Sequence, residues 1–159
     1  MRWILLMFLG LQTPAIAQTK MNWSDVKMTA IRLSPHQDLK QELIALAKKH
    51  QLKAGFIATC VGSLEQIHIR YANEDNGTLL KGHFEIVSLV GTFSDMSSHI
   101  HISVSDSTGK IIGGHLLDNN LIYTTAEIVV GELTDLEFNR SPDSTYGYKE
   151  LDVKIRKKN

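Results

Sequence analysis

The chain has 159 residues, of which 43% are hydrophobic and 21% are charged. This size and composition are typical of one soluble globular domain with a single hydrophobic core. Lysine plus arginine and aspartate plus glutamate both number 17, so the net charge is zero and there is no surplus of positive charge to favour nucleic-acid binding. The C-terminal residues 152–159 are basic but contain no aromatic side chains to stack on bases, and we expect a solvated tail there.

The N-terminal residues have the pattern of a secretory signal peptide. Arg2 supplies a positive charge, a short apolar run follows, and small residues stand at Ala15 and Ala17. The pattern predicts a signal peptide at 1–17, cleavage between Ala17 and Gln18, and a periplasmic or secreted mature protein without a stable membrane anchor. The apolar run is shorter than the about 20 residues that span a bilayer. An uncleaved N-terminal anchor is the alternative.

The mature chain is expected to begin with a segment at 18–29, followed by the main domain. Residues 25–33 alternate loosely and predict a strand. Residues 34–52 then predict a helix, with Ser34 as its N-cap and Pro35 at the first helical position. One face of this helix carries an apolar stripe that consists of Leu39, Leu43, Leu46 and Ala47.

The rest of the chain is strand-like and is divided by turn sequences rich in Asn, Asp, Ser and Gly. One early helix followed by short strands at hairpin spacing predicts an α+β domain. We expect a mostly antiparallel, curved β-sheet with the N-terminal helix packed on it. The expected strands are 55–61, 64–72, 82–93, 99–105, 110–117 and 121–133.

Cysteine chemistry is not expected to contribute to function. Cys60 is the single cysteine, so no intramolecular disulfide can form. Because Cys60 lies in an apolar stretch, the sequence predicts a buried, inert thiol.

Three histidines lie close together around one predicted hairpin. Residues 107–109 have the composition of a three-residue loop that ends in a left-handed glycine, which sets Asp106 opposite Lys110. Counting outward from this pair places His101 opposite His115, and His99 lies two residues along the same strand face.

The other face of this hairpin is apolar and is expected to pack against the helix. Its residues are Ile100, Ile102, Val104, Ile112 and Leu116. A register slip of one residue would move the third histidine to the apolar face. Gly113 lies beside the histidines and leaves room for a ligand or another backbone to approach.

Three neutral imidazoles that converge suit a divalent transition metal, most often Zn²⁺, with one position left for water or substrate. The metal ligands predicted in this way are His99, His101 and His115. The alternative is that these are three unrelated histidines on a polar strand face. The remaining histidines show no comparable grouping and are interpreted as surface or packing residues: His36, His50, His68 and His83.

Several segments between residues 30 and 151 occur in the order and at the spacing of a known family. They are AIRLSPHQDLKQELIALAKKH, AGFIATCVGSLEQIHIRYA, FEIVSLVGTFS, HIHISVSDSTGKIIGGHL, TTAEIVVGEL and TYGYKEL. Together they resemble the plant and prokaryote conserved (PPC) domain, also described as PD1-like or DUF296. The resemblance implies an antiparallel α/β subunit that assembles as a homotrimer and contacts other proteins.

A DNA-binding label is attached to some members of this family by analogy with plant proteins that carry AT-hooks. The present sequence has no Arg-Gly-Arg-Pro core, no basic surplus and an expected export signal. Binding to nucleic acid is therefore not expected. The partners that we expect are further copies of this chain and an unidentified small molecule or protein.

The architecture of this family is also similar to that of zinc-dependent acetolactate decarboxylase and of a zinc ester hydrolase. Both hold their metal with an H-x-H pair and a later histidine, which the three histidines of this chain match. The resemblance thus leaves two main functions open, a metal-holding binding module and a metal-dependent hydrolase or lyase, with DNA binding as the least favoured alternative. An enzyme would need groups for proton transfer and anion binding, for which Glu127, Glu85 and Arg140 are candidates.

Overall fold

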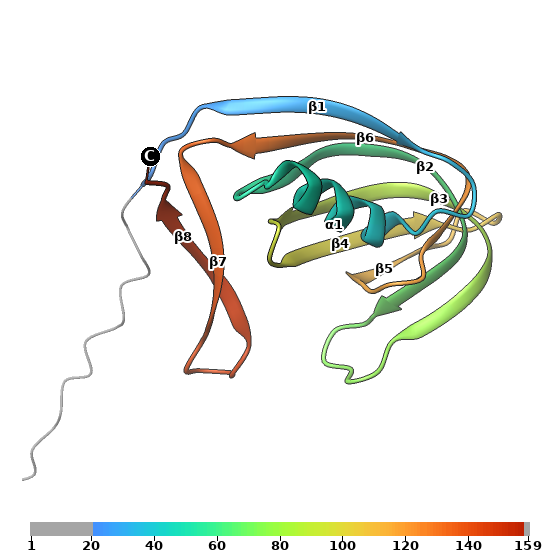
Figure 1. Ribbon diagram of the computed structural model, residues 1–159. Helices are drawn as coiled ribbons and strands as arrows, with labels where there is room; N and C mark the ends of the chain where they lie inside the picture. The colour runs from blue at the N-terminus through green and yellow to red at the C-terminus, as the bar shows by residue number, and fades with distance from the viewer. Residues whose placement is uncertain (1–20, 158–159) are drawn as a thin grey trace, which may run out of the picture.

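The computed structural model describes residues 21–157, and the predicted signal peptide at 1–17 lies outside them. Within the described residues the chain forms one helix and eight strands (Figure 1). Their bounds are β1 Val26–Leu33, α1 Leu39–His50, β2 Gly55–Arg70, β3 Thr78–Phe93, β4 Ser98–Ser105, β5 Ile111–Leu116, β6 Leu121–Leu133, β7 Leu136–Pro142 and β8 Lys149–Ile155. No helix among these residues is both long and apolar enough to cross a membrane.

The first six strands form one antiparallel sheet in the order β1-β6-β2-β3-β4-β5. An additional pairing between β2 and β5 joins Ile69 to Leu116 and Arg70 to His115. This pairing closes strands β2 to β5 on themselves, so the sheet curls strongly around the helix (Figure 1). The predicted antiparallel, curved sheet with one helix is confirmed.

The helix begins later than predicted. Its N-cap is Asp38, whose carboxylate accepts hydrogen bonds from the backbone N–H groups of Lys40 and Gln41. The predicted cap at Ser34 is wrong because the backbone of residues 36–39 hydrogen-bonds to residues 120–122 at the start of β6 and coils into a helix only after Asp38. His36 has a left-handed backbone (φ 68°) and donates its N–H to the carbonyl of Ile122 at 2.8 Å.

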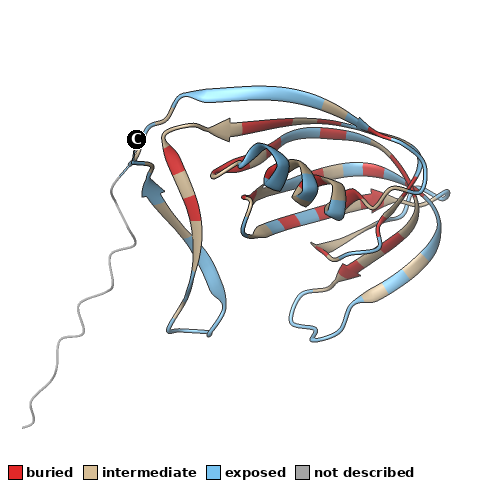
Figure 2. Cartoon of the chain, in the orientation of Figure 1, coloured by how far each residue is buried: buried red, intermediate tan, exposed pale blue. Residues whose placement is uncertain are grey.

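The core lies between the helix and the concave face of the sheet. Buried and exposed residues alternate along the central strands, as a half-buried sheet requires (Figure 2). The predicted stripe packs here: Leu39, Leu43 and Ala47 are fully buried, and Leu46 is partly buried. The apolar hairpin face joins the same core through Ile100, Ile102, Val104 and Leu116, with Ile112 at its edge.

The single cysteine behaves as predicted. Cys60 is buried in this core, and burial raises the pKa of its thiol to about 12. The thiol therefore stays protonated, which leaves it a poor nucleophile.

Strands β7 and β8 form a separate two-stranded hairpin with a small apolar core of its own. The buried residues there are Ala54, Leu136 and Phe138, and Leu133 and Val153 pack against them. Residues 152–155, expected to belong to a solvated tail, are part of β8. Val153 packs against the hairpin core, whereas Lys154 and Ile155 are exposed.

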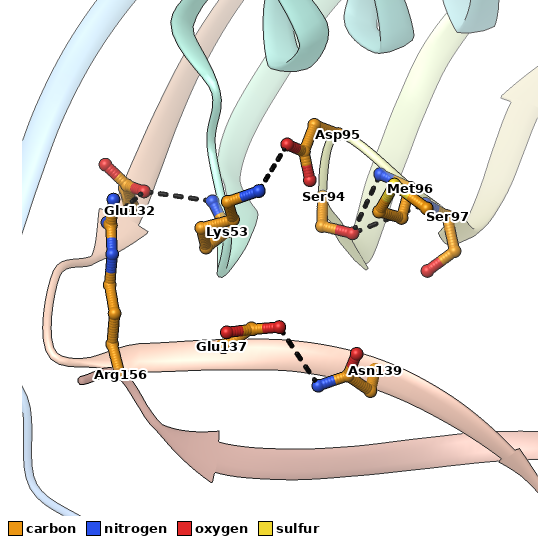
Figure 3. A network of polar contacts seen from close by, with 9 residues as sticks. All are labelled: Lys53, Ser94, Asp95, Met96, Ser97, Glu132, Glu137, Asn139 and Arg156. Carbon is orange, nitrogen blue, oxygen red and sulfur yellow. Dashed lines mark hydrogen bonds and ion pairs between the residues drawn. The ribbon is translucent and has the colours of Figure 1, made fainter.

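Polar contacts attach this hairpin to the main sheet around Lys53 (Figure 3). The backbone N–H of Lys53 donates to a carboxylate oxygen of Glu132 at 3.0 Å, and its ammonium donates to Asp95 at 2.6 Å. Arg156 of the hairpin region reaches the same Glu132 oxygen at 3.5 Å. Phe138 donates its backbone N–H to the carbonyl of Lys53. These contacts fix where β7 lies relative to the start of β2.

We expect Asp38→Ala to lower the free energy of unfolding by about 1–2 kcal/mol, because it removes the acceptor for two N–H groups of the first helical turn and for the N–H of Asn119. Ser34→Ala is the matched control and should change stability by less than about 0.5 kcal/mol. Urea unfolding followed by circular dichroism measures both. Equal effects of the two substitutions would contradict the assigned helix start.

Candidate metal centre

The turn between β4 and β5 is held by a dense set of hydrogen bonds to Asp106. Its carboxylate accepts from the backbone N–H and hydroxyl of Thr108, at 2.8 and 2.6 Å, and from the N–H of Lys110 at 3.0 Å. The backbones of Asp106 and Lys110 also pair directly. Gly109 has φ 82°, which is the left-handed conformation that the predicted loop requires.

This turn fixes the register that the sequence predicted. His101 lies opposite His115, and Ser103 lies opposite Gly113. His99 is two residues from His101 on the same strand. All three imidazoles therefore come to one face of one hairpin, and the predicted convergence is confirmed.

The three rings are close enough to share one ion. The ring centroids of His99, His101 and His115 are separated by 5.0, 5.3 and 5.5 Å. One nitrogen from each ring lies within 4.8 Å of the nitrogens from the other two. Nε2 of His99 lies 3.1 Å from Nε2 of His101.

Glycines let β5 pack tightly between its two neighbours. A Cβ on Gly113 would lie 2.7 Å from the carbonyl oxygen of Ile102, and one on Gly114 would lie 2.6 Å from that of Arg70. Of the two expectations for Gly113, a ligand or another backbone beside it, the structure shows the backbone, that of Ile102 on β4. This tight packing holds His115 against both β4 and β2.

The histidines open into a cavity of about 990 Å³ that the C-terminal hairpin helps to line. Arg140, a predicted anion-binding candidate, lies on β7 in this wall. Its Nη1 is 3.3 Å from Nδ1 of His99, and its Nη2 donates to the hydroxyl of Thr92 at 3.0 Å. The structure therefore brings Arg140 into direct contact with the histidine cluster.

The two predicted carboxylates lie elsewhere. Glu85 is exposed on β3 opposite Ser105, and Glu127 is exposed on β6 opposite Arg32, and neither lines the cavity. Glu150 of β8 lines the cavity instead.

Sequence reasoning also missed Arg70 and Tyr148, which line the same cavity. Arg70 is opposite His115 through the β2–β5 pairing, and Tyr148 lies just before β8. Both placements depend on contacts between distant segments. The nearest signal in the sequence was the TYGYKEL motif, which contains Tyr148 and Glu150.

The surroundings favour neutral imidazoles. Burial lowers the pKa of His115 from 6.5 to about 4, and the neighbouring charges of His99 and His101 act in the same direction. Burial also lowers the pKa of His99, with Arg140 as the next cause. Neutral imidazole is the form that binds a metal ion, so protons compete little for these ligands near pH 7.

The other four histidines are separate from this cluster, as predicted. His36 contacts Glu65 at 2.8 Å, and His68 contacts the carbonyl of Asp118 at 2.8 Å. His83 stacks on Tyr123, and His50 is exposed at the end of α1. Among the described residues, only the three predicted histidines form a group suited to a metal ion.

Comparison with known proteins agrees with the motifs and with the fold. Residues 22–134 match the Plants and Prokaryotes Conserved (PCC) domain. The chain belongs to this family. The matched residues include the whole histidine hairpin and end before β7, so Arg140 and Glu150 lie outside the match.

The chain shares more than 40% of the aligned residues with several proteins. The bifunctional protein GlmU of Synechococcus sp. (strain JA-2-3B'a(2-13)) is 44% identical over 128 residues, which are 80% of this chain but only 20% of that protein. The chain thus spans about a fifth of the length of this curated relative. A hypothetical protein from Salmonella cholerae-suis (Salmonella enterica) is 41% identical, with a TM-score of 0.84 over 85% of this chain and 98% of that chain.

A third protein shows the same fold at lower identity. It is a metal-containing protein from Archaeoglobus fulgidus, 23% identical, with a TM-score of 0.72 over 83% of this chain and 98% of that chain.

We expect the metal-free protein to lose stability as the pH falls from 6.5 to about 4. In this window His115 stays neutral in the folded chain but takes up a proton in the unfolded chain, so protons favour unfolding. Urea unfolding with a chelator present, repeated across the window, measures the slope. His115→Asn should make the slope shallower, and an unchanged slope would contradict the assigned environment of His115.

Proposed function

We propose that this protein is an exported, homotrimeric member of the family that holds a divalent metal ion through His99, His101 and His115. It acts as a binding module for an unidentified small molecule or protein. The observation that carries the proposal is the convergence of three imidazole nitrogens within 4.8 Å of one another.

The donor set fits zinc or a similar divalent transition metal. Two nitrogens on a tetrahedral zinc ion, each about 2.0–2.1 Å from it, lie about 3.3 Å apart. The Nε2 atoms of His99 and His101 are 3.1 Å apart, close to that value. Three histidines would leave one position open toward the cavity. The metal-containing protein from Archaeoglobus fulgidus, which has the same fold, gives further support.

Export and trimer formation are supported by different features. The signal-peptide pattern at 1–17 supports export to the periplasm or beyond. Val61, Val87 and Val90 are each more than half exposed on β2 and β3, and burial of such side chains favours self-association. Because Val90 lies opposite His101, a subunit contact there would border the histidine face.

A metal-dependent hydrolase or lyase acting on a small carbonyl or ester substrate is the second candidate function. The observation in its favour is the position of Arg140 and Glu150 in the cavity wall beside the histidines. A bound ion would supply Lewis-acid chemistry. Arg140 would orient an anionic group of the substrate, and Glu150 is better placed to move a proton than Glu85 or Glu127. The expected likeness to acetolactate decarboxylase points to the same class of reaction.

Nucleic-acid binding is the least favoured function. The chain carries equal numbers of acidic and basic residues, 17 of each. Proteins that bind nucleic acid neutralise phosphates with clustered Lys and Arg, which this balance does not favour.

His101→Ala should abolish binding of the metal, because it removes one of only three ligands. We expect about one zinc or similar ion per chain in the untagged wild-type protein, measured by elemental analysis together with the mass from light scattering. His83→Ala is the matched control, since His83 is an exposed histidine on a neighbouring strand. Equal metal content in wild type and His101→Ala would contradict the site, and a monomeric mass would contradict the trimer.

A further inference from the structure

Both ring nitrogens of His99 are engaged. Nδ1 faces Nη1 of Arg140 at 3.3 Å, and Nε2 faces Nε2 of His101 at 3.1 Å. A guanidinium group only donates hydrogen bonds, so Nδ1 of His99 must be the acceptor of its contact. The single proton of the neutral ring then lies on Nε2, from which it is donated to His101.

Metal binding requires the opposite arrangement of that proton. Nε2 of His99 lies on the side of the other two histidines, so it is Nε2 that would donate a lone pair to an ion shared by the three. The proton of the neutral ring then resides on Nδ1. A metal-ligating histidine normally donates this second N–H to a carboxylate, a carbonyl or water. Arg140 offers Nδ1 only donors, so the hydrogen bond seen here and metal ligation exclude each other.

We propose that metal loading releases Arg140 from His99 and makes its guanidinium available to the carboxylate of a small ligand bound beside the metal. This inference rests on the proposed metal site. One carboxylate oxygen then lies between two donors, Nδ1–H of His99 and the guanidinium of Arg140. The metal and the carboxylate occupy different places in the site, and binding of each therefore favours binding of the other.

The charges of the cavity wall favour such an anion. Arg70, Arg140 and Lys149 line the cavity as cations, and Glu150 is its one carboxylate. Arg140 remains tethered after release, because its Nη2 donates to the hydroxyl of Thr92 at 3.0 Å. A planar guanidinium held in this way is suited to a two-point contact with a carboxylate. The cavity volume of about 990 Å³ is sufficient for a small molecule.

Glu150 is the competing occupant of the place between Arg140 and His99. Glu150 lines the same cavity as both groups, and its negative charge raises the pKa of Arg140 against the lowering effect of burial. Among the residues that the structure describes, Glu150 and Arg140 form no salt bridge. In the cavity wall this single carboxylate stands against three cationic side chains. An external carboxylate is therefore favoured over Glu150.

The test measures zinc affinity by competition with a chelating dye, in sodium chloride and in sodium acetate at equal ionic strength. The proteins are the wild type, Arg140→Gln and Lys149→Gln. Both variants remove one positive charge from the same cavity wall, but only Arg140 contacts His99. In chloride, Arg140→Gln should bind zinc up to about tenfold more tightly than Lys149→Gln, because no hydrogen bond to His99 has to be broken.

Acetate should raise the zinc affinity of the wild type and of Lys149→Gln but not that of Arg140→Gln. By linkage, zinc should raise the acetate affinity of the wild type by the same factor. Arg140→Met, which keeps the apolar stem without donors, should behave like Arg140→Gln and serves if that variant does not fold.

Three results would overturn the inference, and they are distinguishable. Wild type that binds no zinc would overturn the metal site itself. Zinc binding with equal affinities in Arg140→Gln and Lys149→Gln, or with an acetate effect retained in Arg140→Gln, would overturn only the release of Arg140. An acetate effect that appears only in the additional variant Glu150→Gln would show that Glu150 itself occupies the position between Arg140 and His99. That result would overturn the proposal of an external carboxylate ligand.

Discussion

The turn centred on Asp106 is the constraint on which the site depends. One carboxylate accepts three hydrogen bonds within five residues, and Gly109 supplies the left-handed backbone that closes the loop. Because side chains alternate along a strand, a slip of one residue would turn His115 into the core and bring Leu116 to the surface. Burial of Leu116 beside the other apolar residues of the hairpin opposes such a slip from the opposite face. Turn chemistry and core packing therefore select the same register.

The features that the sequence could predict are those whose contacts join residues close together in the chain. The turn, the pairing of His101 with His115 and the apolar stripe of the helix all depend on residues fewer than about 20 positions apart, where periodicity and turn preferences apply. The predicted helix start was wrong because Asp38 and the two residues before it pair with the beginning of β6, more than 80 positions away. Pro35 and Ser34 satisfy the local pattern of a helix start, but the backbone that follows them forms hydrogen bonds with β6 instead of a helical turn.

The same range of contacts explains why the part of the cavity wall formed by the C-terminal hairpin was missed. Glu150, Tyr148 and the position of Arg140 depend on how the β7–β8 hairpin docks on the main sheet, and that docking rests on a small separate core and on the contacts of Lys53 with Glu132 and Asp95 (Figure 3). Arg140 could be named as a candidate from its residue type alone. Its contact with His99 could not, because hairpin and histidines are about 40 residues apart and belong to different sheets.

The two parts of the site have opposed electrostatic requirements. The histidine hairpin offers neutral ligands to a cation, and the low pKa values of His99 and His115 keep protons away from them. The wall around them carries Arg70 and Arg140, whose positive charges lower the affinity for a divalent cation in a partly buried site. A site for a metal alone would gain from carboxylates in these places. An anion bound beside the metal would offset the charge of the ion and of the arginines together, so the cationic wall favours joint binding of the two. The arrangement of charge thus favours the proposed pair of ligands, a metal ion and an anion bound side by side.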